Sequence, residues 1–398
     1  MTGTGYVRRP CGALTLNNVI GKHTRRCPAT PYTGHVLAGQ GAIRTAFPLA
    51  LVLALAACTA GPSISPTSSS SPSPDAGGDD CAARAVPPFV AESGFSGANA
   101  LGHVIRIVCD FDTNPAGVRD RAPGTPGREA VATYLGDVLA GYGWRVSRQD
   151  FSGLEYLDLD KGSVASFIDA ESCSTADRER LRSLTFSNVV AERGTGRDLW
   201  VLMAHYEAKA EASSDPDPAN RTRPVPGAND GASGVAVWLE AARLLSERST
   251  ATLRILLVDG EDGFEDCHPL AGSLFHAVMM GGPERSRIRG VYLLDMVGDP
   301  QPGFCYGHNA PGLRDAVVGS AAALGVTALA EAPDCRVVDD HTAFTDLGVP
   351  ALDLIDFRGG RYPPYWHTLQ DVPSTLSAEM LADVGRVMMR TLERLTAP

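Results

Sequence analysis

Residues 199–204 read LWVLMA, a short apolar run that leads directly into His205. Runs of four to eight mainly apolar residues, bounded by turn residues, are typical of buried strands. The chain has three further runs of this kind, which are TLRILLV at 252–258, VYLL at 291–294 and ALDLI at 351–355. We therefore expect four strands that are buried on both faces, as in a parallel sheet.

Helical patterns lie between these runs. Apolar residues recur at three- and four-residue steps over 233–246 and 378–395. A further helix is expected at 128–142, after the turn-rich segment RAPGTPG. Strands that alternate with helices predict an α/β fold, a three-layer sandwich in which helices cover both faces of a mostly parallel central sheet. The sequence shows no internal repeat, so we expect one folded domain over 81–398.

The overall composition is that of an acidic globular protein. The chain has 398 residues, of which 44% are hydrophobic, and its 35 basic and 46 acidic side chains give a formal net charge of -11. A nucleic-acid-binding protein needs a basic surface, and anionic lipids repel an acidic one. The composition therefore argues against nucleic-acid partners and against electrostatic binding to membranes.

The first 80 residues do not have the pattern of a folded core. Residues 46–57 read AFPLALVLALAA, which has the length of the apolar part of a signal peptide and is too short to span a bilayer. Small residues then precede Cys58, so the stretch resembles a bacterial lipoprotein signal, in which the cysteine carries the lipid. The alternative is a buried core element. The Ser/Pro-rich segment 59–80 has the composition of a disordered tether. We expect a leader and signal peptide at 1–58 and an exported protein, anchored by lipid at Cys58 to the outer face of a bacterial cell membrane.

Six cysteines lie outside the leader and the predicted lipid site: Cys81, Cys109, Cys173, Cys267, Cys305 and Cys335. An even number is consistent with disulfides in an oxidising compartment, although the pairing does not follow from the sequence. The alternative is six buried free thiols. None of the six belongs to a CxxC motif, so we do not expect a thiolate zinc site.

Polar side chains follow each predicted strand. His205 follows the first strand, the segment DGED at 259–262 follows the second, Asp295 follows the third, and a loop leads from the fourth to Trp366-His367. In open α/β sheets, ligands bind at the carboxyl ends of the strands. The sequence therefore predicts a functional site at this edge of the sheet.

Several residues near these strand ends have the side chains that metal ions prefer. Asp230 lies between glycines in GANDGASG, where it either ligates a cation or caps the following helix. Glu261 and Asp262 are adjacent, so one can bind a metal while the other acts as a base; the alternative is two solvated loop acids. His341 and His367, taken singly, are more often structural than ligands. Together, carboxylate and imidazole groups without thiolates predict zinc with an open coordination position.

The polar segments follow one another in the order AHYE, PGANDGASG, DGEDG, LLDMVGD, DDH and PYWHTLQD. This order resembles the zinc-dependent M28 aminopeptidase superfamily, and within it the animal-type glutaminyl-peptide cyclotransferases (glutaminyl cyclases) and their bacterial relatives. The most specific portion is DDHTAFTDLGVPALDLI followed by YWHT. The resemblance extends from Arg121 to the C-terminal helix and implies a zinc-exopeptidase-like (phosphorylase/hydrolase-like) fold.

The same resemblance implies a metal centre. One zinc ion would be bound by Asp230, Asp262 and His367, and Glu261 would be the proton shuttle. Two departures from the family pattern affect this centre. The usual HxD motif has Glu207 in place of its aspartate, and the usual pair of glutamates is Glu261-Asp262 here.

Other roles are implied around the metal. Asp295 and Asp339 would form a hydrogen-bonded acidic pair beside the substrate, and Trp366 would line the pocket. In the two-zinc branch of the superfamily, His205 and Asp295 would instead hold a second zinc, with Asp230 bridging the ions. The longer acid Glu207 would orient His205 poorly, which argues against that second site.

The implied reaction converts the N-terminal glutamine of a peptide or protein to pyroglutamate and releases ammonia, with the metal as a Lewis acid and Glu261 as general base and then general acid. The alternative is a zinc aminopeptidase in which Glu261 activates water. A third possibility, a non-catalytic scaffold, is disfavoured because each site position keeps a functional side chain. We expect a monomer that meets membranes only through its lipid anchor.

Overall fold

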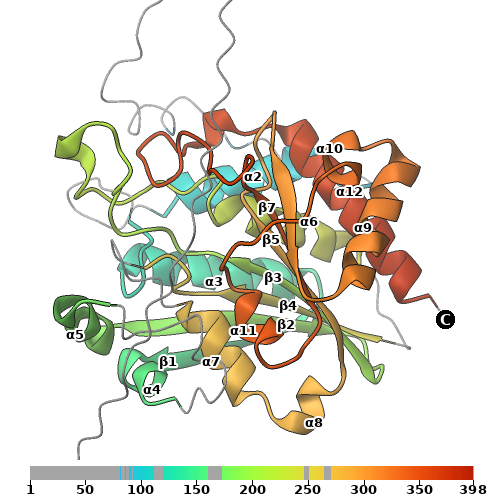
Figure 1. Cartoon of the computed structure of the whole chain (residues 1–398), viewed down its shortest axis with the longest axis horizontal. Helices are drawn as coiled ribbons and strands as arrows, with labels where there is room; N and C mark the ends of the chain where they lie inside the picture. The colour runs from blue at the N-terminus through green and yellow to red at the C-terminus, as the bar shows by residue number, and fades with distance from the viewer. Residues whose placement is uncertain are drawn as a thin grey trace, which may run out of the picture. The chain divides into compact units, whose positions relative to one another are not determined.

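Among the described residues, seven strands form one mixed sheet in the order β1-β2-β4-β3-β5-β7-β6 (Figure 1). The strands are β1 (Arg145–Ser152), β2 (Thr185–Arg193), β3 (Asp198–His205), β4 (Ala251–Val258), β5 (Ile288–Asp295), β6 (Phe304–His308) and β7 (Ala351–Asp356). The four central strands, β4, β3, β5 and β7, are parallel to one another. They are the four strands predicted from the apolar runs, and their carboxyl ends lie at one edge of the sheet.

The computed structural model describes residues 81, 86, 89–91, 93–111, 120–159, 173–245, 251–263 and 270–397. All of them belong to one compact unit, Ser69–Pro398. The predicted leader and signal peptide, the tether and the predicted lipid site Cys58 lie outside the described residues. Within the described part, no helix is both long enough and apolar enough to cross a bilayer.

The outer strands run antiparallel to their neighbours and were not predicted. β1 pairs with β2, β2 with β4, and β6 with β7 in antiparallel register. β1 has the sequence RVSRQDFS, and most of its residues are exposed or half-buried, so it lacks the apolar run that identifies a central strand. β6 has only five residues. Edge strands of this kind are specified by pairing with a neighbour more than by their own composition.

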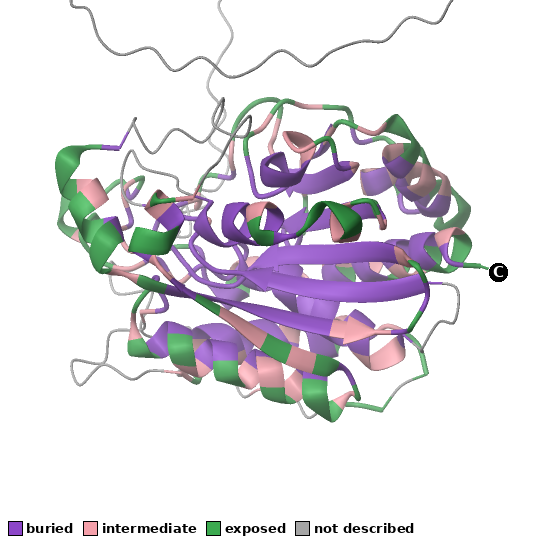
Figure 2. Cartoon of the chain, turned by 90° about the horizontal axis from the view of Figure 1, so that it is seen from below, coloured by how far each residue is buried: buried purple, intermediate pink, exposed green. Residues whose placement is uncertain are grey.

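Helices cover both faces of the sheet, as the sequence predicted (Figures 1 and 2). One face packs against α2 (Gly97–Cys109), α3 (Pro126–Gly141), α6 (Ala232–Leu244), α9 (Pro311–Leu324) and α12 (Ala378–Leu395). The other packs against α4 (Gly153–Leu157), α5 (Thr175–Ser183), α7 (Ala271–Met279) and α11 (Thr342–Thr345). The remaining short helices are α8 (Gly282–Arg285), α10 (Thr327–Ala330) and the 3₁₀ turns η2 (Pro218–Asn220) and η3 (Pro373–Thr375).

Residues of β3 show why the central strands need cover on both sides. Trp200 and Leu202 point into the core beneath α6, whereas Val201 and Met203 point into the core beneath α7. Alternate side chains of a strand face opposite sides of the sheet, so an uninterrupted apolar run requires two apolar layers. Figure 2 shows the result as buried central strands between helices whose outer faces are exposed.

Disulfide bonds confirm the prediction made from the cysteine count. Cys81 is bonded to Cys109 and Cys305 to Cys335, and Cys173 is also disulfide-bonded. The alternative of free thiols is therefore wrong for these five residues. Cross-links of this type stabilise a fold chiefly by restricting the unfolded chain.

The buried His103 of α2 and the half-buried Tyr134 of α3 are in contact, and this contact generates a stability prediction. The Nδ1 atom of His103 lies 2.6 Å from the hydroxyl of Tyr134, and the imidazole is 1% exposed. Burial, assisted by the charge of Arg106, lowers the pKa of His103 from 6.5 to about 3. The folded state thus holds this imidazole neutral, while the unfolded chain protonates it below pH 6.5.

The His103→Asn variant keeps a side-chain acceptor for Tyr134 and removes the titration. As the pH falls from 6.5 to about 3, the free energy of unfolding of the wild type should decrease faster than that of the variant. The difference is about 1.4 kcal/mol per pH unit for one proton. Above pH 6.5 the two pH profiles should be parallel. Urea denaturation of both proteins at pH 7, 6, 5 and 4 measures this difference, and parallel curves below pH 6.5 would contradict it.

Candidate metal and catalytic centre

The ends of the parallel strands bring the predicted site residues together. His205 is the last residue of β3 and pairs with Val258, the last residue of β4, so the Glu261 segment begins beside His205. Asp295 ends β5, the next strand on the other side of β3. The convergence follows from the parallel register, which places the carboxyl ends of neighbouring strands side by side.

The three residues predicted to bind zinc lie in mutual contact. The Nε2 atom of His367 is 2.9 Å from Asp262 Oδ1 and 3.3 Å from Asp230 Oδ2. One ligand atom from each residue lies within 4.8 Å of the others, and all three residues are buried. Two carboxylate oxygens and one imidazole nitrogen form a ligand set that suits a catalytic zinc ion with a free position.

Asp230 also belongs to a second cluster. The Nε2 atom of His205 lies 3.1 Å from Asp230 Oδ1 and 3.2 Å from Asp295 Oδ1. Asp230 therefore directs one oxygen toward each histidine. This second group, His205, Asp230 and Asp295, also has the spacing that a metal ion requires.

The loop that carries Asp230 is held in place by hydrogen bonds to its backbone groups. The carboxylate of Asp371 accepts hydrogen bonds from the amides of Asn229 (2.7 Å) and Asp230 (3.0 Å). Gly231 has φ +86°, and a Cβ atom at this position would lie 2.8 Å from the ring of His205, so only glycine fits here. α6 begins after Gly231 without a side-chain cap, so the alternative role of Asp230 as a helix cap is wrong.

Arg121 holds the carbonyl groups of the same loop. Its guanidinium donates to the carbonyl oxygens of Tyr206 (2.9 Å) and Gly227 (2.5 Å) and is also bonded to that of Pro226. Arg121 is 6% exposed. A buried guanidinium therefore connects the end of β3 to the Asp230 loop and places a positive charge near the carboxylates.

His367 adopts a conformation that is rare for a side-chain-bearing residue. Its φ is +55°, in the left-handed region, where strain of roughly 1–3 kcal/mol is expected. Its ring stacks on Trp366 with centroids 3.5 Å apart, and Trp366 stacks in turn on Tyr362 at 4.1 Å. The aromatic stack fixes the plane of the imidazole and places the predicted pocket residue Trp366 directly against the metal-binding group.

Glu261 and Asp262 have different environments although they are adjacent. Asp262 contacts His367, whereas no hydrogen bond of the Glu261 side chain is found within the described part of the chain. Desolvation raises the pKa of Glu261 well above its usual value, and the charge of Asp262 raises it further. Glu261 is thus a carboxyl group that retains a proton more readily than an exposed glutamate does.

Asp339, the predicted partner of Asp295, lies among buried carboxyl groups. Burial raises the pKa of Asp339 well above its usual value, and the charges of Asp295 and Asp340 raise it further. Burial and the charge of Asp339 likewise raise the pKa of Asp353 on β7. Neither carboxylate oxygen of Asp353 has a hydrogen-bond partner within the described part of the chain, so the cluster is crowded by like charges and retains protons more readily than exposed carboxyl groups do. The hydrogen bond between Asp295 and Asp339 stays a prediction.

Comparison with known proteins agrees with this arrangement. Residues 188–392, just over half of the chain, match the family described as Peptidase family M28. The chain belongs to peptidase family M28. Among curated proteins, this M28 protein is 27% identical over 304 residues to the glutaminyl-peptide cyclotransferase-like protein of Bos taurus, covering 67% of this chain and 70% of the relative. It is 26% identical over 313 residues to the glutaminyl-peptide cyclotransferase of Boiga irregularis, covering 68% and 76%.

Solved structures extend the likeness of the M28 protein to the whole described unit. The glutaminyl cyclase of Porphyromonas gingivalis superposes with a TM-score of 0.62 at 25% identity, over 76% of this chain and 99% of that one. A Zn-dependent exopeptidase from Parabacteroides distasonis superposes with a TM-score of 0.61 at 23% identity, over 79% and 100%, which indicates a shared fold. The zinc-exopeptidase-like fold is thereby confirmed.

Three important residues of the M28 protein were not singled out from the sequence, namely Arg121, Asp353 and Asp371. Asp353 had a signal, because it is the one charged residue in the apolar run ALDLI of a buried strand. Arg121 and Asp371 act on a loop about 100 and 140 residues away, and nothing local identifies them. His276 and His308 lie outside the centre, with His276 next to Arg254 and His308 next to Asp334.

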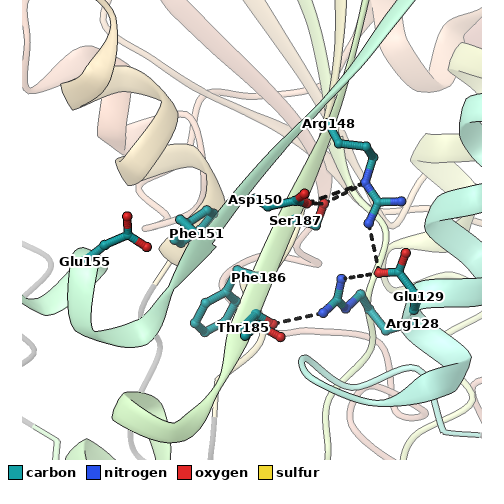
Figure 3. Close-up of a pocket in the computed structure, with 9 residues that line it drawn as sticks. All are labelled: Arg128, Glu129, Arg148, Asp150, Phe151, Glu155, Thr185, Phe186 and Ser187. Atoms are coloured by element: carbon teal, nitrogen blue, oxygen red, sulfur yellow. Dashed lines mark hydrogen bonds and ion pairs between the residues drawn. The ribbon is translucent and has the colours of Figure 1, made fainter.

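A separate cavity of about 470 Å³ lies between α3 and strands β1 and β2 (Figure 3). Arg128 and Arg148 both donate to Glu129, at 3.1 and 2.9 Å, and Arg128 also donates to the carbonyl of Thr185. The charged groups Arg128, Glu129, Arg148 and Asp150 are thus paired with one another, and the carboxylate of Glu155 accepts hydrogen bonds from Ser152. None of the residues predicted for the reaction lines it.

The ligand set predicts how zinc binding responds to substitution. Asp262→Asn replaces a charged ligand oxygen next to His367 by a neutral amide, and should weaken zinc binding by at least about 100-fold. Zinc affinity is measured by chelator competition and zinc content by atomic absorption. Asp217→Asn, on an exposed turn, is the matched control and should bind zinc like the wild type. Equal affinities of the three proteins would exclude Asp262 as a ligand.

Proposed function

We propose that this M28 protein is a zinc-dependent glutaminyl-peptide cyclotransferase, which converts the N-terminal glutamine of peptides to pyroglutamate and releases ammonia. The main observation in support is the environment of Glu261. Its side chain has no hydrogen bond among the described residues, and it adjoins the cluster of Asp230, Asp262 and His367. The names of its relatives, glutaminyl-peptide cyclotransferases and glutaminyl cyclases, support the same activity.

The donor set fits zinc, since it combines carboxylate and imidazole groups that are buried together. Asp230, Asp262 and His367 would hold the ion. When bound, zinc supplies a Lewis acid that polarises the side-chain carboxamide of the substrate glutamine.

Glu261 carries the proton transfers of the reaction. The α-amine of the substrate attacks the carbonyl carbon of its own side chain, which forms a C–N bond and closes a five-membered ring. Glu261 takes one proton from this amine and delivers it to the departing nitrogen, so the original C–N bond breaks and ammonia leaves. Both reacting groups belong to one residue, so holding the folded conformer supplies much of the acceleration.

Asp339 retains a proton more readily than an exposed carboxyl group, because burial and the charges of Asp295 and Asp340 raise its pKa. A proton on Asp339 lets it lie near Asp295 despite their like charges. A protonated Asp339 donates a hydrogen bond to the substrate as negative charge develops on its carboxamide oxygen. Trp366, stacked on His367, forms the wall against which the glutamine side chain packs.

The surroundings of His205 favour one zinc ion over two. Metal-binding histidines usually donate their second ring N–H to a carboxylate or carbonyl. The Nδ1 atom of His205 lacks a hydrogen-bond partner among the described residues, and the nearest carboxylate oxygen, of Glu207, is 3.6 Å away. We therefore propose that the Nε2 atom of His205 forms hydrogen bonds with Asp230 and Asp295 and does not bind a second zinc ion.

A zinc aminopeptidase is the second candidate. The specific observation in its favour is the group of His205, Asp230 and Asp295, which has the spacing of a second metal site. In that enzyme the same Glu261 would take a proton from water, and peptide bonds would be hydrolysed.

Product analysis separates the two activities. The purified protein with zinc and a glutaminyl dipeptide should release ammonia and a pyroglutamyl dipeptide, with about one zinc per chain. Glu261→Gln should lower kcat by about 100- to 10,000-fold because the proton shuttle is lost, while zinc content is unchanged.

Release of free glutamine, with two zinc ions per chain, would instead establish the aminopeptidase. Asp150→Asn, beside the separate cavity of Figure 3, is the control and should retain wild-type turnover. Full activity of Glu261→Gln would remove Glu261 from the mechanism of either enzyme.

We also propose that the protein is exported and attached to the outer face of a bacterial membrane by lipid at Cys58. The apolar segment before Cys58 and the disulfides of the folded unit support this location. Cells that express the full chain should incorporate labelled palmitate into the protein, and Cys58→Ser should abolish the label. Unchanged labelling of Cys58→Ser would refute the anchor.

A further inference from the structure

Glu207 occupies an unusual position behind the catalytic carboxylates. It lies two residues beyond the end of β3 and is fully buried. Its Oε1 atom accepts hydrogen bonds from two consecutive backbone amides, those of Glu261 at 2.6 Å and Asp262 at 3.0 Å. One carboxylate oxygen thus binds the backbone of both the predicted proton shuttle and the predicted metal ligand.

The carboxylate of Glu207 makes no other hydrogen bond in the described part of the chain. Its Oε1 atom is 3.6 Å from His205 Nδ1, beyond hydrogen-bond distance, and its Oε2 atom has no hydrogen-bond partner there. The buried Lys209 donates to the carbonyl of Gly263 at 3.4 Å. The acid that follows the histidine motif is therefore engaged with the backbone after β4 and not with the histidine.

We propose that Glu207 is a positioning residue that sets the directions of Glu261 and Asp262. Hydrogen bonds from two successive amides to one charged oxygen fix the orientation of both peptide planes, and such charge-assisted bonds are about twice as strong as neutral ones. With the peptide planes fixed, the side chain of Asp262 faces His367, and the side chain of Glu261 is left without a hydrogen bond to that histidine. The side-chain length matters, because aspartate would be shorter by one carbon–carbon bond, about 1.5 Å.

This inference rests on the proposed function only for the catalytic role of Glu261, because the two amide hydrogen bonds can be measured without turnover. Three variants test it. Glu207→Asp keeps the charge and shortens the side chain, Glu207→Gln keeps the length and an oxygen acceptor but removes the charge, and Glu211→Gln alters a surface acid of the following loop that pairs with Arg180.

Hydrogen–deuterium exchange of the amides of Glu261 and Asp262 is measured in the metal-free and zinc-loaded proteins, together with zinc affinity, kcat and KM. Glu207→Asp should exchange these two amides at least ten-fold faster, bind zinc about 10- to 100-fold more weakly, and lose kcat more than it raises KM. Glu207→Gln should show the same changes in amide exchange, zinc affinity, kcat and KM, but smaller in magnitude. Glu211→Gln should match the wild type.

Wild-type exchange at both amides in Glu207→Asp and Glu207→Gln would overturn the proposal, and so would faster exchange with unchanged zinc affinity and kcat. If Glu207→Asp fails to fold, the near-isosteric Glu207→Gln decides by the same measurements. If the wild type makes no pyroglutamate but both variants expose the amides and weaken zinc binding, the proposed function fails and the role of Glu207 in holding the backbone stands.

Discussion

The burial of several carboxylates at one edge of the sheet is the constraint on which the rest of the structure depends. Asp230, Asp262, Asp295 and Asp339 are each at most 6% exposed, and Glu261 adjoins them. Ionised carboxylates in such surroundings are costly unless cations or protons compensate them. The protein supplies Arg121, His205 and His367 as partners, the raised pKa values of Asp339 and Asp353 favour their neutral forms, and the Asp230, Asp262 and His367 cluster has the spacing that a metal ion requires.

The scaffold around Asp230 solves the same problem through the backbone. Asp371 binds amide groups of the loop and Arg121 binds carbonyl groups of other peptide units in the same loop. Each of these buried side chains thereby finds backbone partners. Glu207 repeats this arrangement one strand away, where it binds the amides of Glu261 and Asp262. Charged side chains thus fix the ligand-bearing loops that the sheet alone would leave irregular.

The sequence predicted the parts of the fold that depend on local pattern. The central strands and α12 were evident because burial on both faces or on one helical stripe leaves a periodic apolar signal. β1 carries no such signal, since its sequence is mostly polar and it is ordered by pairing with β2. At the centre, the residue types and the order of the motifs identified Asp230, Asp262 and His367. The hydrogen bonds of Asp371 and Glu207 could not be predicted, because each joins segments that meet only in the folded chain.

The adjacency of Trp366 and His367 has an evolutionary consequence. One residue forms the proposed wall for the substrate and the next supplies a nitrogen of the proposed metal site, and the two rings lie face to face. Substrate selectivity and metal binding therefore cannot change independently at position 366. A smaller side chain there would enlarge the proposed substrate pocket and also loosen the imidazole of His367. Tyr362 lies on the outer side of the stack, one ring removed from His367, so evolution can vary this position with less direct effect on the imidazole than a change of Trp366 would have.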